Sequence, residues 1–361
     1  MKRAIMGVHH RQGALKNIGD YIQAIAANQF MRTDAYIDRE ELGLYSGEQC
    51  KLIMNGWFMH EPEKFPPSDK ISPLVVSFHV TPKHEKQILS EAGVEFLKKN
   101  EPIGCRDVAT KKLLESRGIK AYFSGCLTLT LGMSYHFKPT HCGLFLDPII
   151  PYSAQPTKEA LRDAGVVRCL VLHPLKAIKL GKKLRMSNYV LRTRKGIKGW
   201  LRSVVLGAAF LNRYSVCFEE RFLIDSDYAS NMIEWGSLNG KCSVDSELYA
   251  KADEMLRLYS SYKMVVTSRI HCALPCLSIG VPAIFIYDKE DRKAIAGLFD
   301  GRGRFDGIID FLNVMSFDRS WNLSPDFICR RITCDTALPQ KQSWISYADN
   351  LREKCTRFAA D

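Results

Sequence analysis

The chain has 361 residues, of which 46% are hydrophobic and 25% charged, a balance typical of a soluble globular protein. This length allows two ordinary domains, each with a core of its own. The first residues lead directly into a basic stretch without the apolar core of a signal peptide, and the longest apolar run, at 204–211, is too short to span a bilayer.

The 12 cysteines show no repeated spacing and no CxxC pattern. We therefore expect reduced thiols in a cytoplasmic protein. Cys272 and Cys276 lie close to His271, but their spacing differs from that of zinc motifs. The sequence predicts core thiols at these two positions and no metal site.

Strands and helices alternate along the first half of the chain. Apolar runs predict strands at 51–55, 74–80, 102–105, 120–123, 143–146 and 167–173. Helices are predicted from about Asp20 to Phe30, at 85–99 and at 107–117. This alternation indicates an α/β fold with mostly parallel strands.

Polar residues follow several of these strands. Asn17-Ile18-Gly19-Asp20 forms a loop that enters the first helix, where Asp20 is most simply a helix cap. Asn55-Gly56-Trp57 predicts a tight turn with an aromatic ring beside it.

Arg106 and Asp107 stand at the start of another predicted helix. Asp107 is interpreted as the cap of that helix, with Arg106 as its ion-pair partner. Alternatively, Arg106 supplies positive charge to an anionic ligand, because Gly104 would let a ligand approach the backbone. The sequence leaves both interpretations open.

The net charge of +12 resides in one segment. Residues 164–218 contain 12 Lys and Arg and no Asp or Glu, and the other 39 basic residues equal the 39 acidic ones. Within this segment, the stretch around Trp200 has an amphipathic pattern that suits a bilayer interface, although a solvated basic surface would look the same. The chain has no recognised nucleic-acid motif, so we expect no nucleic-acid partner.

Residues 264–286 predict one strand–helix–strand unit of a parallel sheet, with Gly280 ending the helix. Pro275 requires either a place in the first helical turn or a kink. The turn before the helix carries Arg269 and His271, at a strand end where open α/β sheets bind ligands.

That turn favours an anion, because the helix N-terminus presents unpaired N–H groups and Arg269 adds a planar cation. His271 adds a group that exchanges protons near neutral pH. The alternative is that Arg269 pairs with a local carboxylate and His271 is a hydrogen-bonded core residue.

Thr267-Ser-Arg-Ile-His271, followed by Ala-Leu-Pro and Gly-Val-Pro, resembles the C-terminal signature of the polysaccharide pyruvyl transferase family. Further matches lie at 17–23, 54–57, 103–107 and 121–130, in the same order as in the family. The resemblance implies two Rossmann-like domains facing across a cleft, as in GT-B glycosyltransferases. We expect an acceptor-side domain at 1–172, a donor domain at 173–335 and a closing helix within 336–361 that packs back across the hinge.

The resemblance also implies transfer of pyruvate from phosphoenolpyruvate to two hydroxyls of a sugar, which forms a cyclic ketal during cell-surface polysaccharide biosynthesis. It assigns donor binding to Ser268, Arg269, His271 and Arg106. His271, Asp20 and Arg269 are the candidate catalytic residues, with Asp20 as a candidate base. Hydrogen bonds and a stacking face for the acceptor are expected from Asn17, Gly19, Asp20, Asn55 and Trp57. No metal and no cofactor beyond phosphoenolpyruvate as co-substrate is implied.

Two departures from the family pattern are the long basic segment and Cys126, where an acidic residue often follows Ser-Gly. If the acceptor is a lipid-linked oligosaccharide, residues 164–218 would hold the enzyme at the inner face of the membrane. The alternatives to a pyruvyl transferase are a nucleotide-sugar glycosyltransferase of the same architecture and a non-catalytic scaffold of a glycan assembly complex.

Overall fold

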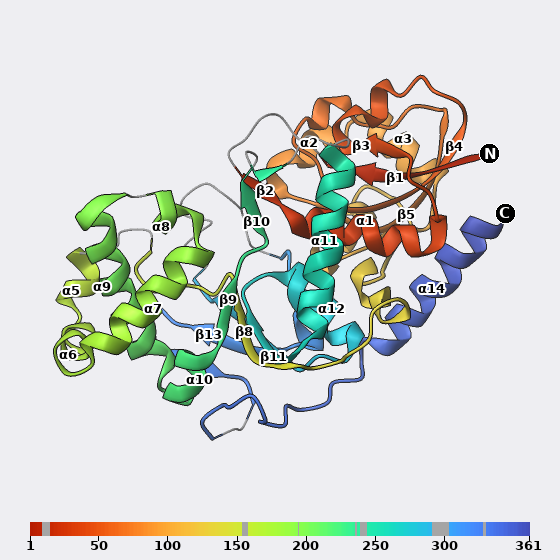
Figure 1. Ribbon diagram of the computed structural model, residues 1–361. Coiled ribbons are helices and arrows are strands. Elements are labelled where there is room, and N and C mark those ends of the chain that lie inside the picture. The colour runs from red at the N-terminus through yellow and green to blue at the C-terminus, as the bar shows by residue number, and fades with distance from the viewer. Residues whose placement is uncertain are drawn as a thin grey trace.

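Two six-stranded sheets organise the protein (Figure 1). The computed structural model describes residues 1–8, 15–153, 158–193, 195–234, 237–238, 244–290, 303–327 and 330–361. The first sheet has the order β3-β1-β4-β5-β6-β7, and all its pairings are parallel. Its strands are β1 Lys2–Gly7, β3 Tyr36–Asp38, β4 Cys50–Phe58, β5 Ile71–Val80, β6 Ile103–Cys105 and β7 Ala121–Phe123.

The second sheet has the order β14-β13-β12-β11-β8-β9 and is parallel except for the β13–β14 pair. Its strands are β8 His141–Leu146, β9 Asp227–Ala229, β11 Tyr262–Thr267, β12 Ala283–Asp288, β13 Asn313–Phe317 and β14 Leu323–Pro325. A two-stranded antiparallel ribbon pairs β2 Leu15–Asn17 with β10 Met232–Glu234. The predicted α/β class with mostly parallel strands is confirmed.

Helices cover both sheets. Those near the first sheet and between the sheets are α1 Ile18–Met31, α2 Glu85–Ile88, α3 Glu91–Lys99, α4 Val108–Glu115, α11 Val244–Ser260, α12 Ile270–Ile279 and α14 Ile345–Ala360. A helical lobe extends from the second sheet on the left of Figure 1. It consists of α5 Lys158–Arg162, α6 Ala164–Leu172, α7 Pro174–Ser187, α8 Tyr189–Thr193, α9 Gly196–Tyr214 and α10 Glu220–Asp225.

Helix α1 joins the two halves. It is apolar on nearly all sides, which is expected of a helix with packed neighbours all round. It contacts β1 and β4 of the first sheet as well as α11 and α12, which flank β11 of the second. The N-terminus of α1 is therefore held where the two sheets approach each other.

The chain moves from one sheet to the other between β7 and β8. The strand predicted at 143–146 exists, but it pairs with β11 in the second sheet. The range 1–172 therefore contains one strand of the second sheet. At the other end of the chain, α14 packs on α1 and β5, and Arg3 Nη2 donates a 2.8 Å hydrogen bond to the carbonyl of Ala359. The C-terminus thus lies beside the first sheet (Figure 1).

Several predictions from the sequence were wrong. Residues 55–57 do not form the predicted tight turn, because β4 continues through them to Phe58. Residues 167–172 belong to helix α6 and not to a strand, with His173 as the C-cap. Asp163 caps the start of this helix by accepting from the Gly165 N–H. The helix predicted at 85–99 is divided, because Ser90 caps a new helix, α3. Cys142 and Cys334 form a disulfide, because folding brings their Cα atoms within 5.4 Å, so these two thiols are not reduced.

Among the described residues, none of the helices combines the length and the apolar character that crossing a bilayer requires.

Candidate active site

The strand β11 delivers the Thr267–His271 turn to the carboxyl edge of the second sheet. Thr267 Oγ1 accepts a 2.9 Å hydrogen bond from the backbone N–H of Arg269, the residue that precedes α12. Helix α12 ends at Gly280, whose φ of 88° is the left-handed conformation that suits glycine. The predicted strand–helix–strand unit is therefore confirmed.

Pro275 distorts the start of α12 at His271. The backbone of His271 is not helical, with φ −81° and ψ 21°. His271 is four residues before Pro275, whose ring clashes with the carbonyl at that position and whose missing N–H cannot bond to it. Of the two alternatives for Pro275, the kink is therefore the one found, and it falls on the candidate catalytic residue.

Arg269 pairs with a carboxylate, as the alternative interpretation anticipated. Its Nε lies 2.9 Å from Oδ2 of Asp147, which follows β8, and 38% of the Arg269 side chain remains exposed. Asp147 also accepts hydrogen bonds from Ser230 Oγ and from the Asn231 N–H. Ser268 Oγ accepts from the Ile149 N–H at 3.1 Å. Asp147 therefore orients Arg269, and Ser268 fixes the neighbouring loop.

His271 is not a hydrogen-bonded core residue. Its Nε2 atom is buried and has no hydrogen-bond partner in the part of the chain that the structure describes. Burial lowers the pKa of His271 well below its usual value, and the positive charges of Arg106 and Arg304 lower it further. The imidazole is consequently neutral at physiological pH in the absence of an anion.

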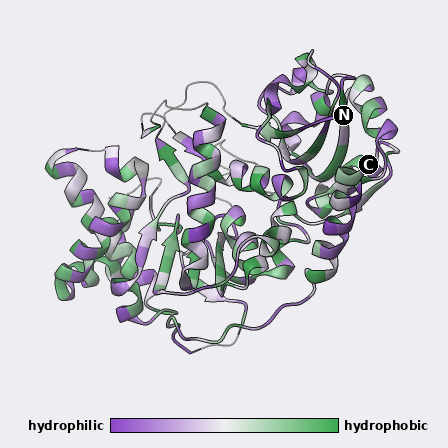
Figure 2. Cartoon of the chain, turned by 45° about the vertical axis from the view of Figure 1, so that its right-hand side comes forward, coloured by the Kyte–Doolittle hydropathy of each residue, from purple (hydrophilic) through white to green (hydrophobic). Residues whose placement is uncertain are grey.

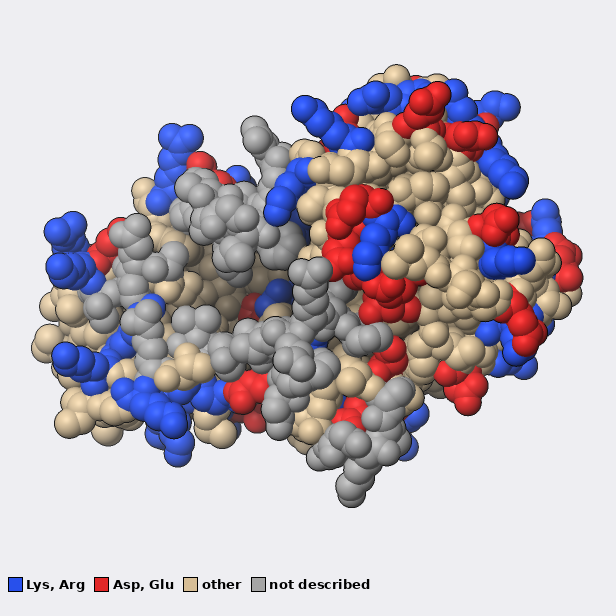
Figure 3. All heavy atoms as spheres, turned by 90° about the horizontal axis from the view of Figure 1, so that it is seen from above, with Lys and Arg blue, Asp and Glu red and all other residues tan. Residues whose placement is uncertain are grey.

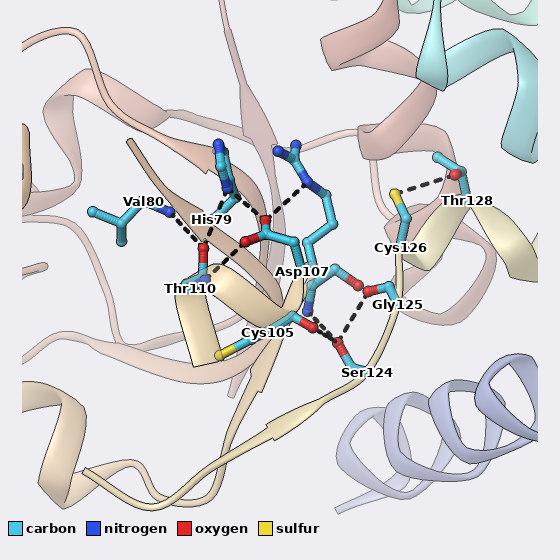
Figure 4. A network of polar contacts seen from close by, with 11 residues as sticks. His79, Val80, Cys105, Asp107, Thr110, Ser124, Gly125, Cys126 and Thr128 are labelled. Carbon is cyan, nitrogen blue, oxygen red and sulfur yellow. Dashed lines mark hydrogen bonds and ion pairs between the residues drawn. The ribbon is translucent and has the colours of Figure 1, made fainter. Parts of the chain in front are cut away.

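A second group of polar side chains lies at the carboxyl ends of β5 and β6 (Figure 4). Asp107 accepts from the Thr110 N–H at 2.8 Å and from Nδ1 of His79 at 2.6 Å. Burial and the charge of Arg106 lower the pKa of His79 to about 4, although Asp107 opposes this shift. Asp107 is the predicted cap of α4, and it also holds His79 as a neutral imidazole with Nε2 unprotonated.

Arg106 is the shared neighbour of the two candidate proton-transfer residues. It is buried, its Nε lies 3.7 Å from Asp107, and that Nε has no hydrogen-bond partner among the described residues. Its charge acts on both Asp20 and His271. The two interpretations of Arg106 are therefore compatible: it lies beside Asp107, and its positive charge also acts on Asp20 and His271.

Asp20 is not the cap of α1. Asn17 takes that position, with Oδ1 accepting from the Gly19 N–H at 3.1 Å. Burial raises the pKa of Asp20, while the charges of Arg39, His60 and Arg106 oppose the rise. The prediction that Asp20 is a simple cap was wrong, and its Oδ1 accepts a 3.4 Å hydrogen bond from Gln23 Nε2.

Asn55 and Trp57 are engaged within the protein. Asn55 is buried, and its Nδ2 donates to the Gln23 carbonyl at 3.1 Å, which ties β4 to α1. The Arg39 guanidinium lies 4.9 Å from the centroid of the Trp57 ring. Gly56 has a φ of 100°, and a Cβ there would meet Gln23 Oε1 at 2.6 Å. The stacking face expected from Trp57 is thus already used, at least on the side that Arg39 covers.

Sequence reasoning missed His79, Arg304, Arg39 and Asp147. His79 and Asp147 carried a detectable signal, because each is a polar residue at the carboxyl end of a predicted apolar strand. Arg304 and Arg39 carried none, because only folding brings them near His271 and Asp20.

The assembled site combines several cations with the carboxyl groups of Asp20, Asp107 and Asp147. Arg106, Arg269 and Arg304 act on a neutral imidazole, and Asp20 lies at the start of α1. Figure 3 shows the molecular surface hollowed between the helical lobe and the first sheet, with a basic side chain beside an acidic one inside the hollow. No cluster of three or more metal-ligating side chains occurs among the described residues. This arrangement suits a small, multiply charged anion that undergoes proton transfer.

The sequence model of the polysaccharide pyruvyl transferase family matches residues 17–290. The match extends from the cap of α1 to the end of β12 and includes His79, Arg106, Asp147 and His271. A comparison with curated proteins found no match. Because the family match covers most of the chain and both groups of site residues, the protein belongs to the polysaccharide pyruvyl transferase family.

Proposed function

We propose that the protein transfers the pyruvate unit of phosphoenolpyruvate to two hydroxyls of a sugar and forms a cyclic ketal in cell-surface polysaccharide biosynthesis. The observation that carries this proposal is the close approach of the start of α1, at Gly19, to His271 of α12, with the charge of Arg106 acting on both His271 and Asp20. The proposed architecture is two Rossmann-like domains across a cleft, as in GT-B enzymes, with the donor held mainly by the second.

Phosphoenolpyruvate carries a carboxylate and a phosphate on three carbons, so its site needs several cations that water does not screen. Arg106 is buried with an unsatisfied Nε, and Arg269 keeps an exposed face beyond its bond to Asp147. Ser268 adds a hydroxyl and the N-terminus of α12 adds backbone N–H groups. In our proposal Arg106 and Arg269 hold the two anionic groups, and His271 lies between them.

The reaction needs one proton on the methylene carbon C3 and the removal of one proton from each sugar hydroxyl. The raised pKa of Asp20 suits a carboxyl that donates a proton to C3, which makes C2 electrophilic. A sugar hydroxyl then adds to C2, and the ionised Asp20 takes its proton. His271 protonates the departing phosphate as the bond between C2 and the phosphate oxygen breaks. The neutral imidazole then accepts the proton of the second hydroxyl as the ketal closes. None of these steps needs a metal ion or a nicotinamide.

The acceptor would enter from the first sheet side, past Asn17, Gly19 and Asp20. Asn55 supports this wall from behind, because its amide bonds to α1. Trp57 lies two residues after Asn55 on the same strand, β4.

The decisive experiment incubates the protein with phosphoenolpyruvate and a panel of lipid-linked sugar analogues, followed by mass spectrometry. The expected product is an acceptor that gains pyruvate with loss of water, together with free phosphate. Arg269→Ala and His271→Ala should each abolish both signals in a folded protein. Thermal protection by a nucleotide sugar without protection by phosphoenolpyruvate would overturn the proposal in favour of a glycosyltransferase. Binding of partner glycosyltransferases without phosphate release would favour a scaffold.

A further inference from the structure

Helices α7 and α9 of the helical lobe form a tightly packed antiparallel pair. A Cβ on Gly181 of α7 would lie 2.5 Å from the carbonyl oxygen of Ser203, and one on Gly207 of α9 would lie 2.3 Å from that of Ala177. These small residues allow the two backbones to approach closely. A groove lies along the seam of the pair, lined by residues of both helices.

The groove has a volume of about 320 Å³ and is lined by Ile178, Lys182, Arg185, Trp200, Ser203 and Val204. Helical spacing extends the same side of α7 to Leu175 and Met186, and the same side of α9 to Ile197. We call these groove-lining and flanking residues the hairpin face. It combines apolar side chains with basic ones along its whole length.

The apolar side chains of the hairpin face project into solvent. Leu175, Met186 and Ile197 are 73%, 67% and 77% exposed, and Trp200 is 46% exposed. Such large apolar groups are normally covered, and several on one face mark an interaction surface. Figure 2 shows hydrophobic segments on the outer helices of this lobe.

Part of the positive charge of the segment is neutralised within the protein. Lys176 pairs with Glu220, Arg192 with Glu234 and Arg213 with Asp163. Lys183 donates to the carbonyls of Ile224 and Ser226. The exposed lysines that remain beside the hairpin face are Lys179, Lys182, Lys195 and Lys198. Figure 3 shows basic side chains gathered over this end of the molecule.

We propose that the hairpin face is a docking surface for an anionic phospholipid bilayer. A bilayer interface offers, within a few ångströms, the negative headgroups that the lysines need and the hydrocarbon that Leu175, Ile197 and Trp200 need. Lysines accept this geometry because their aliphatic stems lie along apolar surface while the ammonium groups reach the headgroups. Trp200 suits the same depth, since indole favours the interface. The lobe stands away from the first sheet, so docking leaves α1 and α12 uncovered (Figure 1).

The experiment is co-sedimentation of the full chain with vesicles of phosphatidylcholine alone or of phosphatidylcholine mixed with phosphatidylglycerol. The protein should bind the anionic vesicles at least about tenfold more tightly than the neutral ones. Lys182→Glu with Lys198→Glu should reduce that affinity at least about tenfold. The matched control is Lys98→Glu with Lys99→Glu, which makes the same charge change on exposed lysines of α3 and should leave vesicle binding unchanged.

Insertion is tested separately through Trp200. Anionic vesicles should shift the tryptophan fluorescence of the wild type to shorter wavelength, and Trp200→Phe should remove most of the shift. Ile197→Ser with Leu175→Ser should weaken binding to anionic vesicles without changing the thermal midpoint, because both side chains are exposed. The proposal would be overturned by equal binding to both vesicle types or by an equal loss of binding in the α3 control. Unchanged fluorescence on binding would also overturn it and would indicate a merely electrostatic contact. Sedimentation does not depend on turnover, so its outcome is independent of the proposed reaction.

Discussion

Gly19 lies directly against His271, and a Cβ at position 19 would be 3.1 Å from both Cβ and Nδ1 of the imidazole. One residue belongs to the helix that packs on the first sheet, and the other to the helix that follows β11 of the second. Their contact fixes the distance between the acidic and the cationic side of the site. The absence of a side chain at position 19 is therefore a condition for the position of His271.

Gly19→Ala tests this contact. Alanine favours a helix by up to about 1 kcal/mol over glycine, so the free energy of unfolding should be unchanged or slightly increased. The new methyl group should displace His271 by a few tenths of an ångström and lower kcat/KM about tenfold or more. Ketal formation and urea unfolding, measured side by side, check both expectations. Full activity in the variant would show that the position of His271 tolerates the shift.

The affinity for phosphoenolpyruvate should fall as the pH rises. Burial and nearby cations lower the pKa of His271 in the free protein, whereas a bound dianion favours the protonated form and raises it. Between these two pKa values, binding takes up a proton, and affinity weakens by at most about tenfold per pH unit. Calorimetry from about pH 5.5 to about pH 8 measures this dependence. In His271→Gln, only the phosphoenolpyruvate itself still titrates, so its affinity should depend less on pH. If the affinity of this variant changed with pH as in the wild type, His271 would not be the group that takes up the proton.

Acid should destabilise the protein through His79. Its pKa is about 4 in the folded state against 6.5 ordinarily, so the unfolded chain binds this proton first as the pH falls. Stability is therefore full above about pH 6.5 and declines towards about pH 4, by roughly 3 kcal/mol over the whole window. His79→Asn retains a donor for Asp107 without a titrating ring. Urea unfolding of the variant should show a flatter pH dependence, and an unaltered slope would assign the acid sensitivity to other groups.

Asp147→Asn should separate binding from turnover. The substitution removes a negative charge 2.9 Å from Arg269 Nε and keeps the size of the side chain. The guanidinium should then attract the anionic donor more strongly, which lowers KM, while its looser orientation lowers kcat. Steady-state kinetics with phosphoenolpyruvate as the varied substrate measure the two effects. A parallel loss in both binding and turnover would mean that Asp147 only maintains the fold.

The disulfide between Cys142 and Cys334 should stabilise the protein. It closes a loop of 192 residues, and cross-links over long loops remove the most entropy from the unfolded chain. Cys142→Ser with Cys334→Ser should lower the free energy of unfolding by about 2–4 kcal/mol. Alkylation of the unreduced wild type followed by mass spectrometry should leave these two cysteines unmodified. Complete alkylation of both would show that they remain thiols.

The sequence by itself was sufficient for features that depend on near neighbours. The apolar runs of β4, β5, β11 and β12 and the stop at Gly280 were all predicted, because they follow from local periodicity and backbone freedom. The charge of residues 164–218 was also predicted, as was a kink at Pro275 as one of two alternatives. Arg269 and His271 were identified for the same reason, as unusual residues at a strand end.

Only the tertiary structure decided which of these residues meet. Asn17, not Asp20, caps α1, and the charge of Arg106 acts on His271 because α1 brings the two sheets together. The assignment of β8 to the second sheet and the proximity of Cys142 to Cys334 have the same origin. Periodicity and capping act over a few residues, whereas these contacts join segments far apart in the chain and arise from the packing of whole helices and sheets. Part of the site, including Arg269 and His271, was therefore readable in the sequence, whereas Arg304, Arg39 and the arrangement of the whole site were not.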